Sequence, residues 1–249
     1  MKDNVYQSSY KVTHYDADPF GYAKPSSLMN YMQDASGLHA KQWGVSVFDL
    51  FVEGKTWVIS RYHLQIFNRP SIGKEIVIRT WPSFVQKSFA LREFEALGPD
   101  QQVIAKATIS VAMIDLKTKK PVAIGDNLPT EYLTPKRAIE EEFVALPKVT
   151  VLTKEVQLPV MIRDLDANGH VNHVVYAQWA LESVPLDTWM THHLTSVEIN
   201  YKAEVRHGAS VISQSEELEG TDKEFAHQIF NLESKVEVAR VRTKWRPKE

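Results

Sequence analysis

The sequence of 249 residues contains no cysteine at all. This absence excludes a disulfide framework, a cysteine-bound zinc or iron–sulfur site, and any mechanism with a thiolate nucleophile. Glycine and proline are also scarce, with 10 and 12 residues respectively, so long disordered or low-complexity stretches are not expected. What remains is the composition of an ordinary folded protein, because 43% hydrophobic residues are enough for a buried core.

An excess of charge of one sign and a long apolar run are missing as well. The 29 basic side chains are balanced by 31 acidic ones, which leaves no global electrostatic reason to expect nucleic-acid binding. No apolar run approaches the ~18 residues of a membrane span. The N-terminal residues also lack the apolar segment of a signal peptide. The sequence therefore predicts a cytoplasmic protein that binds neither nucleic acid nor a membrane.

Hydrophobic periodicity predicts the same order of elements twice, a helix followed by several strands. One helix is expected at 25–43, and a second at 172–184 with Asn172 as N-cap and Pro185 as a stop. The expected strands are 57–67, 75–81, 84–96 and 103–115 after the first helix, and 195–203, 209–216, 224–232 and 236–245 after the second. A helix followed by antiparallel strands is typical of an α+β protein.

A divergent internal repeat accompanies this order of elements. The segment 16–22 aligns with 164–170, and 69–73 aligns with 204–208. The alignment of the first helix with the second also places Leu28 on Tyr176. We therefore predict two repeats joined by a connection that carries one short helix around 135–145. The expected bounds are 1–120 for the N-terminal repeat, 121–150 for the linker and 151–249 for the C-terminal repeat.

The two copies differ at the start of their helices. The second copy carries Asp166, Asn168 and His170, whereas the first carries Asp18, Phe20 and Tyr22 at the aligned positions. Only the second copy therefore offers an amide and an imidazole beside its carboxylate. The difference suggests a division of labour, in which the second repeat does chemistry and the first shapes a pocket.

The stretch from Asp166 to His170 permits two interpretations. Alternate residues of an extended chain point to one side, so a carboxylate, an amide and an imidazole could act together there. The N-terminus of the following helix could add backbone N–H groups for a developing oxyanion. The alternative is a turn that only caps the helix, with Gly169 providing the bend. Spacing alone leaves both interpretations open, and capping turns are the commoner of the two.

Two motifs resemble the signature of the acyl-acyl carrier protein thioesterases. Residues 164–173 contain the pattern D-x-N-x-H-V-N, and 181–185 read L-E-S-V-P. The segment 194–204 is similar to the family's next strand with its acidic residue, Glu204. The resemblance covers essentially the whole chain and implies a double hot-dog fold, two tandem repeats that each wrap an antiparallel sheet around a long helix.

The resemblance also implies an activity and a set of site residues. The activity is hydrolysis of the thioester between a fatty acyl chain and the phosphopantetheine arm of acyl carrier protein. The implied catalytic residues are Asp166, Asn168, His170 and Glu204. Many plant relatives place a cysteine directly after the glutamate, but this chain has Val205 there. Hydrolysis must therefore use a carboxylate, with Glu204 as general base on water or as direct nucleophile.

Further expectations concern the substrate and its carrier. Leu28, Met32 and Trp57 are candidates to contact the acyl chain, although the sequence does not give a chain length. Arg240 and Arg242 are candidates for docking the acidic carrier protein; a solvated strand face is the plainer interpretation of these positions. No cofactor is expected, and the histidine spacing does not favour a metal site. A homodimer is compatible with the resemblance.

Three alternatives to this function are weighed. The first is an acyl-CoA thioesterase of the same fold. The second is a hot-dog hydratase or dehydratase, which fits the D-x-N-x-H spacing less well. The third is an acyl-binding module without catalysis.

Overall fold

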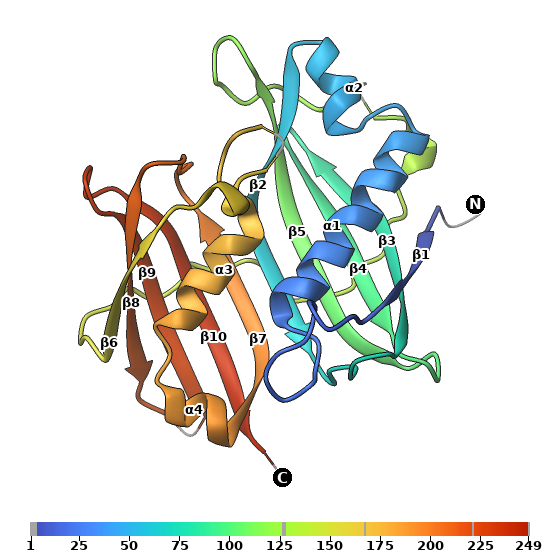
Figure 1. The fold of residues 1–249 in the computed structure, drawn as a ribbon. Coiled ribbons are helices and arrows are strands. Elements are labelled where there is room, and N and C mark those ends of the chain that lie inside the picture. The colour runs from blue at the N-terminus through green and yellow to red at the C-terminus, as the bar shows by residue number, and fades with distance from the viewer. Residues whose placement is uncertain (1–3, 126–127, 167, 221, 249) are drawn as a thin grey trace. The chain divides into compact units, whose positions relative to one another are not determined.

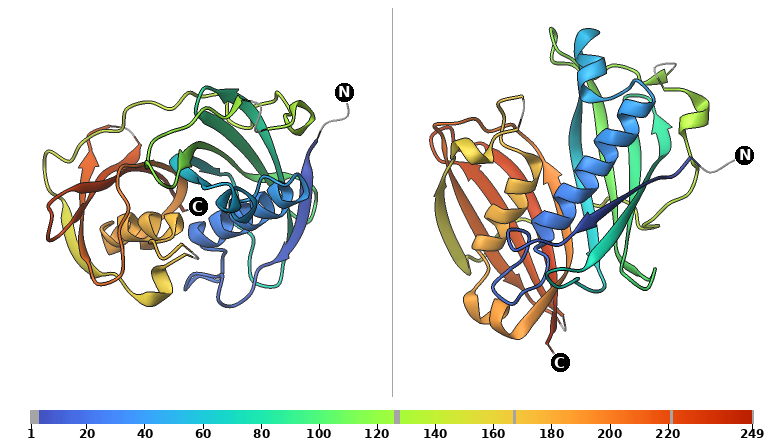
Figure 2. Two further views of the ribbon diagram at one scale, coloured as in Figure 1. Left: turned by 90° about the horizontal axis from the view of Figure 1, so that it is seen from above. Right: turned by 45° about the vertical axis from the view of Figure 1, so that its right-hand side comes forward.

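A computed structural model describes residues 4–125, 128–166, 168–220 and 222–248 of the chain. These residues form two compact units, with the boundary between Glu142 and Phe143. Each unit is an antiparallel sheet with one long helix lying on one face, as Figures 1 and 2 show. Among the described residues, no helix is long and apolar enough to cross a membrane.

The first unit has the strand order β1-β3-β4-β5-β2, and neighbouring strands run antiparallel. Its elements in chain order are β1 (Tyr6–Lys11), α1 (Pro25–Gln42), α2 (Val47–Val52), β2 (Lys55–Ile66), β3 (Glu75–Gln86), β4 (Phe89–Leu97), β5 (Val103–Asp115) and the short 3-10 helix η2 (Thr130–Tyr132). Helix α1 follows the predicted pattern, since Leu28, Met32 and Ala35 are all buried on the face toward the sheet. Pro25 occupies the first turn, and Gly44 follows the helix at a φ of 67°.

The second unit repeats this topology. Its strand order β6-β8-β9-β10-β7 corresponds one for one to that of the first unit, and its neighbouring strands are also antiparallel. Its elements are β6 (Lys154–Pro159), η3 (Ile162–Asp164), α3 (His173–Glu182), α4 (Leu186–Thr191), β7 (His192–Tyr201), β8 (Ser210–Leu218), β9 (Lys223–Asn231) and β10 (Glu237–Pro247). Asn172 caps α3 through its side chain, as predicted. The repeat inferred from sequence is therefore present in the fold.

The predicted break between the strands at 75–81 and 84–96 is in the wrong place. Strand β3 continues through Pro82 to Gln86, and the turn falls at Lys87 and Ser88, where Lys87 has a φ of 55°. A bulge between Pro82 and Phe84 leaves Ser83 without a partner on β4, directly after the proline that cannot donate a ladder hydrogen bond. Proline thus marks an irregularity inside the strand rather than its end.

The predicted helix around 135–145 is also wrong, because this segment contains no helix. Its backbone is instead tied to β3 and β4 of the first unit. The Trp81 indole donates to the carbonyl oxygen of Lys136 at 2.7 Å, and the Ala138 N–H donates to the buried Glu93 carboxylate at 3.0 Å. Tertiary hydrogen bonds outweigh the weak helical pattern here. The boundary between the two units lies within the expected linker at 121–150.

Candidate active site

The loop that precedes α3 is a closed turn. The Asp166 N–H donates to the His170 carbonyl at 2.8 Å, and the Gly169 N–H donates back to the Asp166 carbonyl at 3.0 Å. Gly169 has a φ of 75°, a conformation that a residue with a Cβ adopts only with strain. The expectation of an extended stretch with alternating side chains is therefore wrong. The site is built on a turn, which agrees with the capping interpretation of the local backbone.

Asp166 holds the shape of this turn. One carboxylate oxygen, Oδ1, accepts the backbone N–H of Asn168 at 2.8 Å and that of His170 at 3.2 Å. Asp166 therefore positions Asn168 and His170 through their backbone amides rather than through their side chains. The carboxylate is partly exposed, and the two backbone donors satisfy the oxygen that faces the turn.

The Glu204 carboxylate contacts the imidazole of His170. Glu204 follows β7, and the segment around it lies beside the loop, since Val171 N–H donates to the Val205 carbonyl at 2.9 Å. The distance from Glu204 Oε2 to His170 Nε2 is 3.2 Å. The His170 side chain is 24% exposed and that of Glu204 is 57% exposed, so solvent and substrate can reach the pair. Glu204, which the resemblance implied as a catalytic residue, therefore lies beside the loop that precedes α3.

Arg206 is a member of the site that the sequence analysis missed. Its guanidinium nitrogen lies 3.3 Å from His170 Nε2, the same atom that contacts Glu204. A guanidinium can only donate and a carboxylate can only accept, so a single Nε2 cannot bond to both at once. An unprotonated Nε2 faces Arg206, and a protonated Nε2 donates to Glu204. The signal in the sequence was the spacing, because residues two apart on an extended segment share a face.

Asn168 and the helix start provide the remaining polar groups. The Asn168 side chain is exposed and makes no hydrogen bond within the described part of the chain, so its amide is available to a ligand. The expected oxyanion site at the start of α3 is less open. The Val174 N–H donates to Asn172 Oδ1 at 3.0 Å, and the Val175 N–H donates to the Asn172 carbonyl at 2.9 Å. These two donors are engaged by the cap.

The residues predicted to contact an acyl chain lie in the interior of the first unit. Leu28 and Met32 on α1 are both 0% exposed, and the Tyr62 hydroxyl contacts the Met32 sulfur at 3.4 Å. The Trp57 indole donates to the Val45 carbonyl at 2.9 Å. Its ring packs against a cluster formed by Leu50, Ala90, Met113 and Ile124. Leu28 and Met32 are thus core residues, and Trp57 is a partly buried residue beside the core; their contact with a substrate stays a prediction.

Both candidate docking arginines are engaged within the chain. Arg240 holds the two carboxylate oxygens of Glu237 through bonds of 2.8 Å each, and its side chain is 13% exposed. Arg242 bonds to Glu198 Oε1 at 2.9 and 2.5 Å. Their charges are matched by intramolecular partners. Neither arginine therefore lies on a fully solvated strand face, and the docking role stays a prediction.

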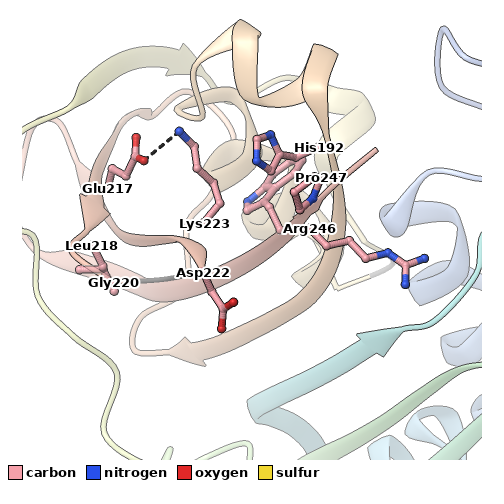
Figure 3. Close-up of a pocket in the computed structure, with 9 residues that line it drawn as sticks. His192, Glu217, Leu218, Gly220, Asp222, Lys223, Arg246 and Pro247 are labelled. Carbon is pink, nitrogen blue, oxygen red and sulfur yellow. Dashed lines mark ion pairs between the residues drawn. The ribbon is translucent and has the colours of Figure 1, made fainter. Parts of the chain in front are cut away.

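A polar cleft of about 260 Å³ opens elsewhere in the second unit, at the ends of β8, β9 and β10. Figure 3 shows the ion pair between Glu217 and Lys223 on its wall, with a distance of 2.8 Å, and His192 on another wall. None of the predicted site residues lines it. Among the described residues, no cluster of three or more histidine, aspartate or glutamate side chains has a geometry suited to a metal ion.

Two models of known protein families match the sequence of this chain. The model of the acyl-ACP thioesterase N-terminal domain matches residues 3–132, and that of the acyl-ACP thioesterase C-terminal domain matches residues 148–247. The chain belongs to the acyl-ACP thioesterase family. The two family domains correspond to the two structural units, and the motif found in the sequence lies in the C-terminal one.

Individual relatives agree with this membership. The chain is 28% identical over 268 residues to a chloroplastic acyl-[acyl-carrier-protein] hydrolase of Cuphea viscosissima, covering 100% of this chain and 64% of the relative. It is 28% identical over 225 residues to a chloroplastic oleoyl-acyl carrier protein thioesterase of Coriandrum sativum, covering 81% and 60%. The chain thus spans less than two thirds of the length of these two family members.

Solved structures of family members share the whole fold. An acyl-ACP thioesterase from Bacteroides thetaiotaomicron superposes with a TM-score of 0.89 at 25% identity, covering 98% of each chain. A 12:0-ACP thioesterase from Umbellularia californica gives a TM-score of 0.87 at 22% identity, covering 100% of this chain and 99% of the other. The predicted α+β fold of two tandem hot-dog repeats is confirmed.

Proposed function

We propose that this protein hydrolyses fatty acyl-acyl carrier protein to a free fatty acid and the carrier protein. One observation carries the proposal: His170 Nε2 lies 3.2 Å from Glu204 Oε2 at an exposed site, in a chain that belongs to the acyl-ACP thioesterase family. An imidazole and a carboxylate in contact can supply the general acid and the base or nucleophile for hydrolysis of a thioester when no thiolate is present. The acyl carrier protein is the expected partner.

The reaction can be assigned to these groups with water as the nucleophile. The Glu204 carboxylate takes a proton from water as the water oxygen bonds to the thioester carbonyl carbon. The side-chain amide of Asn168 donates to the carbonyl oxygen as its negative charge develops. The carbon–sulfur bond then breaks, and the leaving sulfur takes a proton from His170 Nε2. Glu204 returns its proton to the imidazole, which restores the starting state.

A second version uses Glu204 directly as the nucleophile. Its carboxylate oxygen attacks the carbonyl carbon, and the sulfur leaves with a proton from His170. Water then hydrolyses the acyl anhydride, which releases the fatty acid and the Glu204 carboxylate and returns one proton to His170. Single-turnover hydrolysis in oxygen-18 water detects the second version when water attacks the glutamyl carbonyl of the anhydride. With water attack, the label enters only the fatty acid. Label in the Glu204 carboxylate would exclude water attack as the sole route.

Fatty-acid release from purified protein tests the proposal. Acyl carrier protein and coenzyme A thioesters of graded chain length should be assayed side by side, and the carrier thioesters should give the higher kcat/KM. Faster turnover of the coenzyme A thioesters would instead support the acyl-CoA thioesterase alternative. Thiol-blocking reagents should leave the rate unchanged, because the chain has no cysteine.

The other two alternatives give different products. A hydratase or dehydratase would add or remove water on the acyl chain and leave the thioester intact, which mass spectrometry of the carrier-bound product detects. An acyl-binding module would bind the thioester without releasing fatty acid, and Glu204→Ala would leave that binding intact. Either result would contradict the proposed hydrolysis.

A further inference from the structure

The hydroxyl group of Tyr176 is bonded to both neighbours of Glu204. It accepts the backbone N–H of Val205 at 3.1 Å and donates to the backbone carbonyl of Ala203 at 3.2 Å. Ala203 and Val205 flank Glu204 directly. One side chain on α3 therefore holds both peptide groups that determine where the Glu204 side chain leaves the backbone.

The tyrosine ring is itself firmly placed. Tyr176 is 4% exposed, and its ring packs against Trp179 with centroids 5.1 Å apart and against Tyr201 with centroids 5.5 Å apart. Burial raises the pKa of Tyr176 above its ordinary value; the bond from Val205 opposes this effect, and the charges of Glu204 and Asp166 add to it. The hydroxyl therefore keeps its proton, which it needs to donate to Ala203.

We propose that Tyr176 is a positioning residue for the carboxylate of Glu204. By holding Ala203 and Val205 it fixes the approach of Glu204 to His170, across the 3.2 Å contact on which the proposed hydrolysis depends. The inference rests on the proposed function, since it assigns a role in that reaction. Tyr176 does not touch the reacting atoms, and its effect is through the backbone of the catalytic residue.

The first repeat has neither a tyrosine at the position aligned with Tyr176 nor a glutamate at the position aligned with Glu204. The position aligned with Tyr176 is Leu28, which is 0% exposed and has no hydroxyl group. The position aligned with Glu204 is Arg69, which pairs with Asp18. The hydroxyl is therefore present in the repeat that carries the carboxylate and absent from the repeat that does not. A purely structural need of the fold would apply to both helices.

Tyr176→Phe removes the hydroxyl and keeps the ring packing. We expect kcat to fall by about 10- to 100-fold, the size of effect that misplacing a catalytic group by about 1 Å produces. KM for the acyl carrier thioester should stay within about twofold, because Tyr176 contacts no substrate group. A rise in KM with unchanged kcat would overturn the proposal.

A double-mutant cycle with Glu204→Gln isolates the positioning role. If Tyr176 acts through Glu204, Tyr176→Phe has no further effect on kcat once Glu204 is glutamine. If the two losses multiply, the tyrosine acts independently of Glu204 and the proposal is wrong. The cycle also separates positioning from partial unfolding, which would lower the rate in both backgrounds.

Tyr201→Phe is the matched control. Its hydroxyl donates to the His173 carbonyl at 3.1 Å, within the same aromatic cluster, but it bonds to neither neighbour of Glu204. We expect kcat within about twofold of the parent protein, as for a single hydrogen bond remote from the reacting groups. A loss equal to that of Tyr176→Phe would assign the effect to a loosened α3 and overturn the positioning role.

Amide hydrogen exchange gives a readout that does not depend on turnover. In Tyr176→Phe the Val205 amide loses its acceptor, so its exchange should accelerate at least tenfold relative to the amide of Ile199 in the centre of β7. Unchanged exchange at Val205 would overturn the positioning role in an otherwise active enzyme. Failure of the parent protein to release fatty acid from any thioester would instead overturn the proposed function.

Discussion

The loops before α1 and α3 have the same backbone and opposite chemistry. In both, an aspartate N–H bonds to the carbonyl four residues on at 2.8 Å, and a glycine N–H bonds back at 3.0 Å. In both, one aspartate oxygen accepts two backbone N–H groups, from Phe20 and Tyr22 in the first loop and from Asn168 and His170 in the second. Backbone geometry therefore does not distinguish the loop with a candidate site from the loop without one.

The side chain arriving from the neighbouring segment makes the difference. In the first loop Arg69 bonds to Asp18 at 2.5 Å, with both side chains less than 10% exposed, and its guanidinium lies over the Tyr22 ring. In the second loop the aligned residue is Glu204, which meets His170. A buried ion pair occupies one loop, and a partly exposed, titratable pair occupies the other. The same position in the repeat thus forms an internal ion pair in one copy and belongs to the candidate site in the other.

Glu204→Gln should have the largest effect. Removing the proposed base or nucleophile should lower kcat by about 10³-fold or more, because the amide can neither take a proton nor attack the thioester. The unfolding free energy should change by less than about 0.5 kcal/mol, because the side chain is exposed. Fatty-acid release and urea unfolding measure the two quantities. Glu233→Gln, at another exposed position in the same unit, is the control; equal losses in the two variants would contradict the assignment.

Arg69→Met should lower the unfolding free energy strongly and leave kcat nearly unchanged, the opposite of Glu204→Gln. It leaves the Asp18 carboxylate buried without its cation, which costs about 3–5 kcal/mol of unfolding free energy. Activity per folded molecule should change little. The double variant Asp18→Asn with Arg69→Met should recover part of the loss, since no unpaired charge is then buried. A stability change below about 1 kcal/mol in the single variant would refute a structural role for this pair.

Exchanging His170 and Tyr22 tests the division of labour directly. His170→Tyr places the first-loop residue in the second loop and should lower kcat by about 10²-fold, through loss of the proton donor. Tyr22→His places an imidazole beside Asp18 and Arg69. Because the position aligned with Glu204 is Arg69 in this loop, the imidazole has no glutamate partner, and kcat should stay within about twofold. Comparable losses in the two variants would show that the first loop also takes part in the reaction.

The effect that is smallest for a change of one pH unit concerns a feature that the two repeats share. His39 and His227 are each no more than 1% exposed, and burial lowers the pKa of each from 6.5 to about 3, with the charge of Arg92 adding to the effect on His39. The folded protein keeps both neutral while the unfolded chain binds a proton below pH 6.5. The unfolding free energy should therefore fall as the pH drops from 6.5 toward 3, by about 1.4 kcal/mol per pH unit for each histidine.

Replacing either histidine with glutamine should remove its share of this dependence. Urea unfolding at pH 6.5 and 5.5 measures the slope, and His207→Gln at an exposed position is the control. A slope that stays the same in His227→Gln would mean that the dependence arises from other groups. A slope that falls only in His39→Gln would show that the two repeats do not share the feature.

The sequence was most informative where local pattern determines structure. The apolar stripe of α1 depends on residues three or four apart, and the Asn172 cap of α3 joins residues two apart, so local pattern predicted both helices. The motif and the repeat together identified the four predicted site residues, and the structure brings His170 and Glu204 into contact.

The sequence was least informative where the contacts are long-range. The contact of Arg206 with His170 joins residues 36 apart, and the bonds of Tyr176 reach residues 27 and 29 further along the chain. Apart from the spacing of Glu204 and Arg206, no local pattern in the sequence indicates these contacts. The segment after Tyr132 was mistaken for a helix for the same reason, because the buried Glu93 on β4 fixes its path.

The matching backbones of the two loops have a consequence for protein engineering. The first loop already provides the turn, the carboxylate anchor and the approach of a neighbouring segment that the second loop uses. The first loop thus has the backbone of the candidate site without its side chains. The aligned residues of the second loop define the substitutions that would introduce them. The two loops therefore differ in a few side chains and share the same backbone hydrogen bonds.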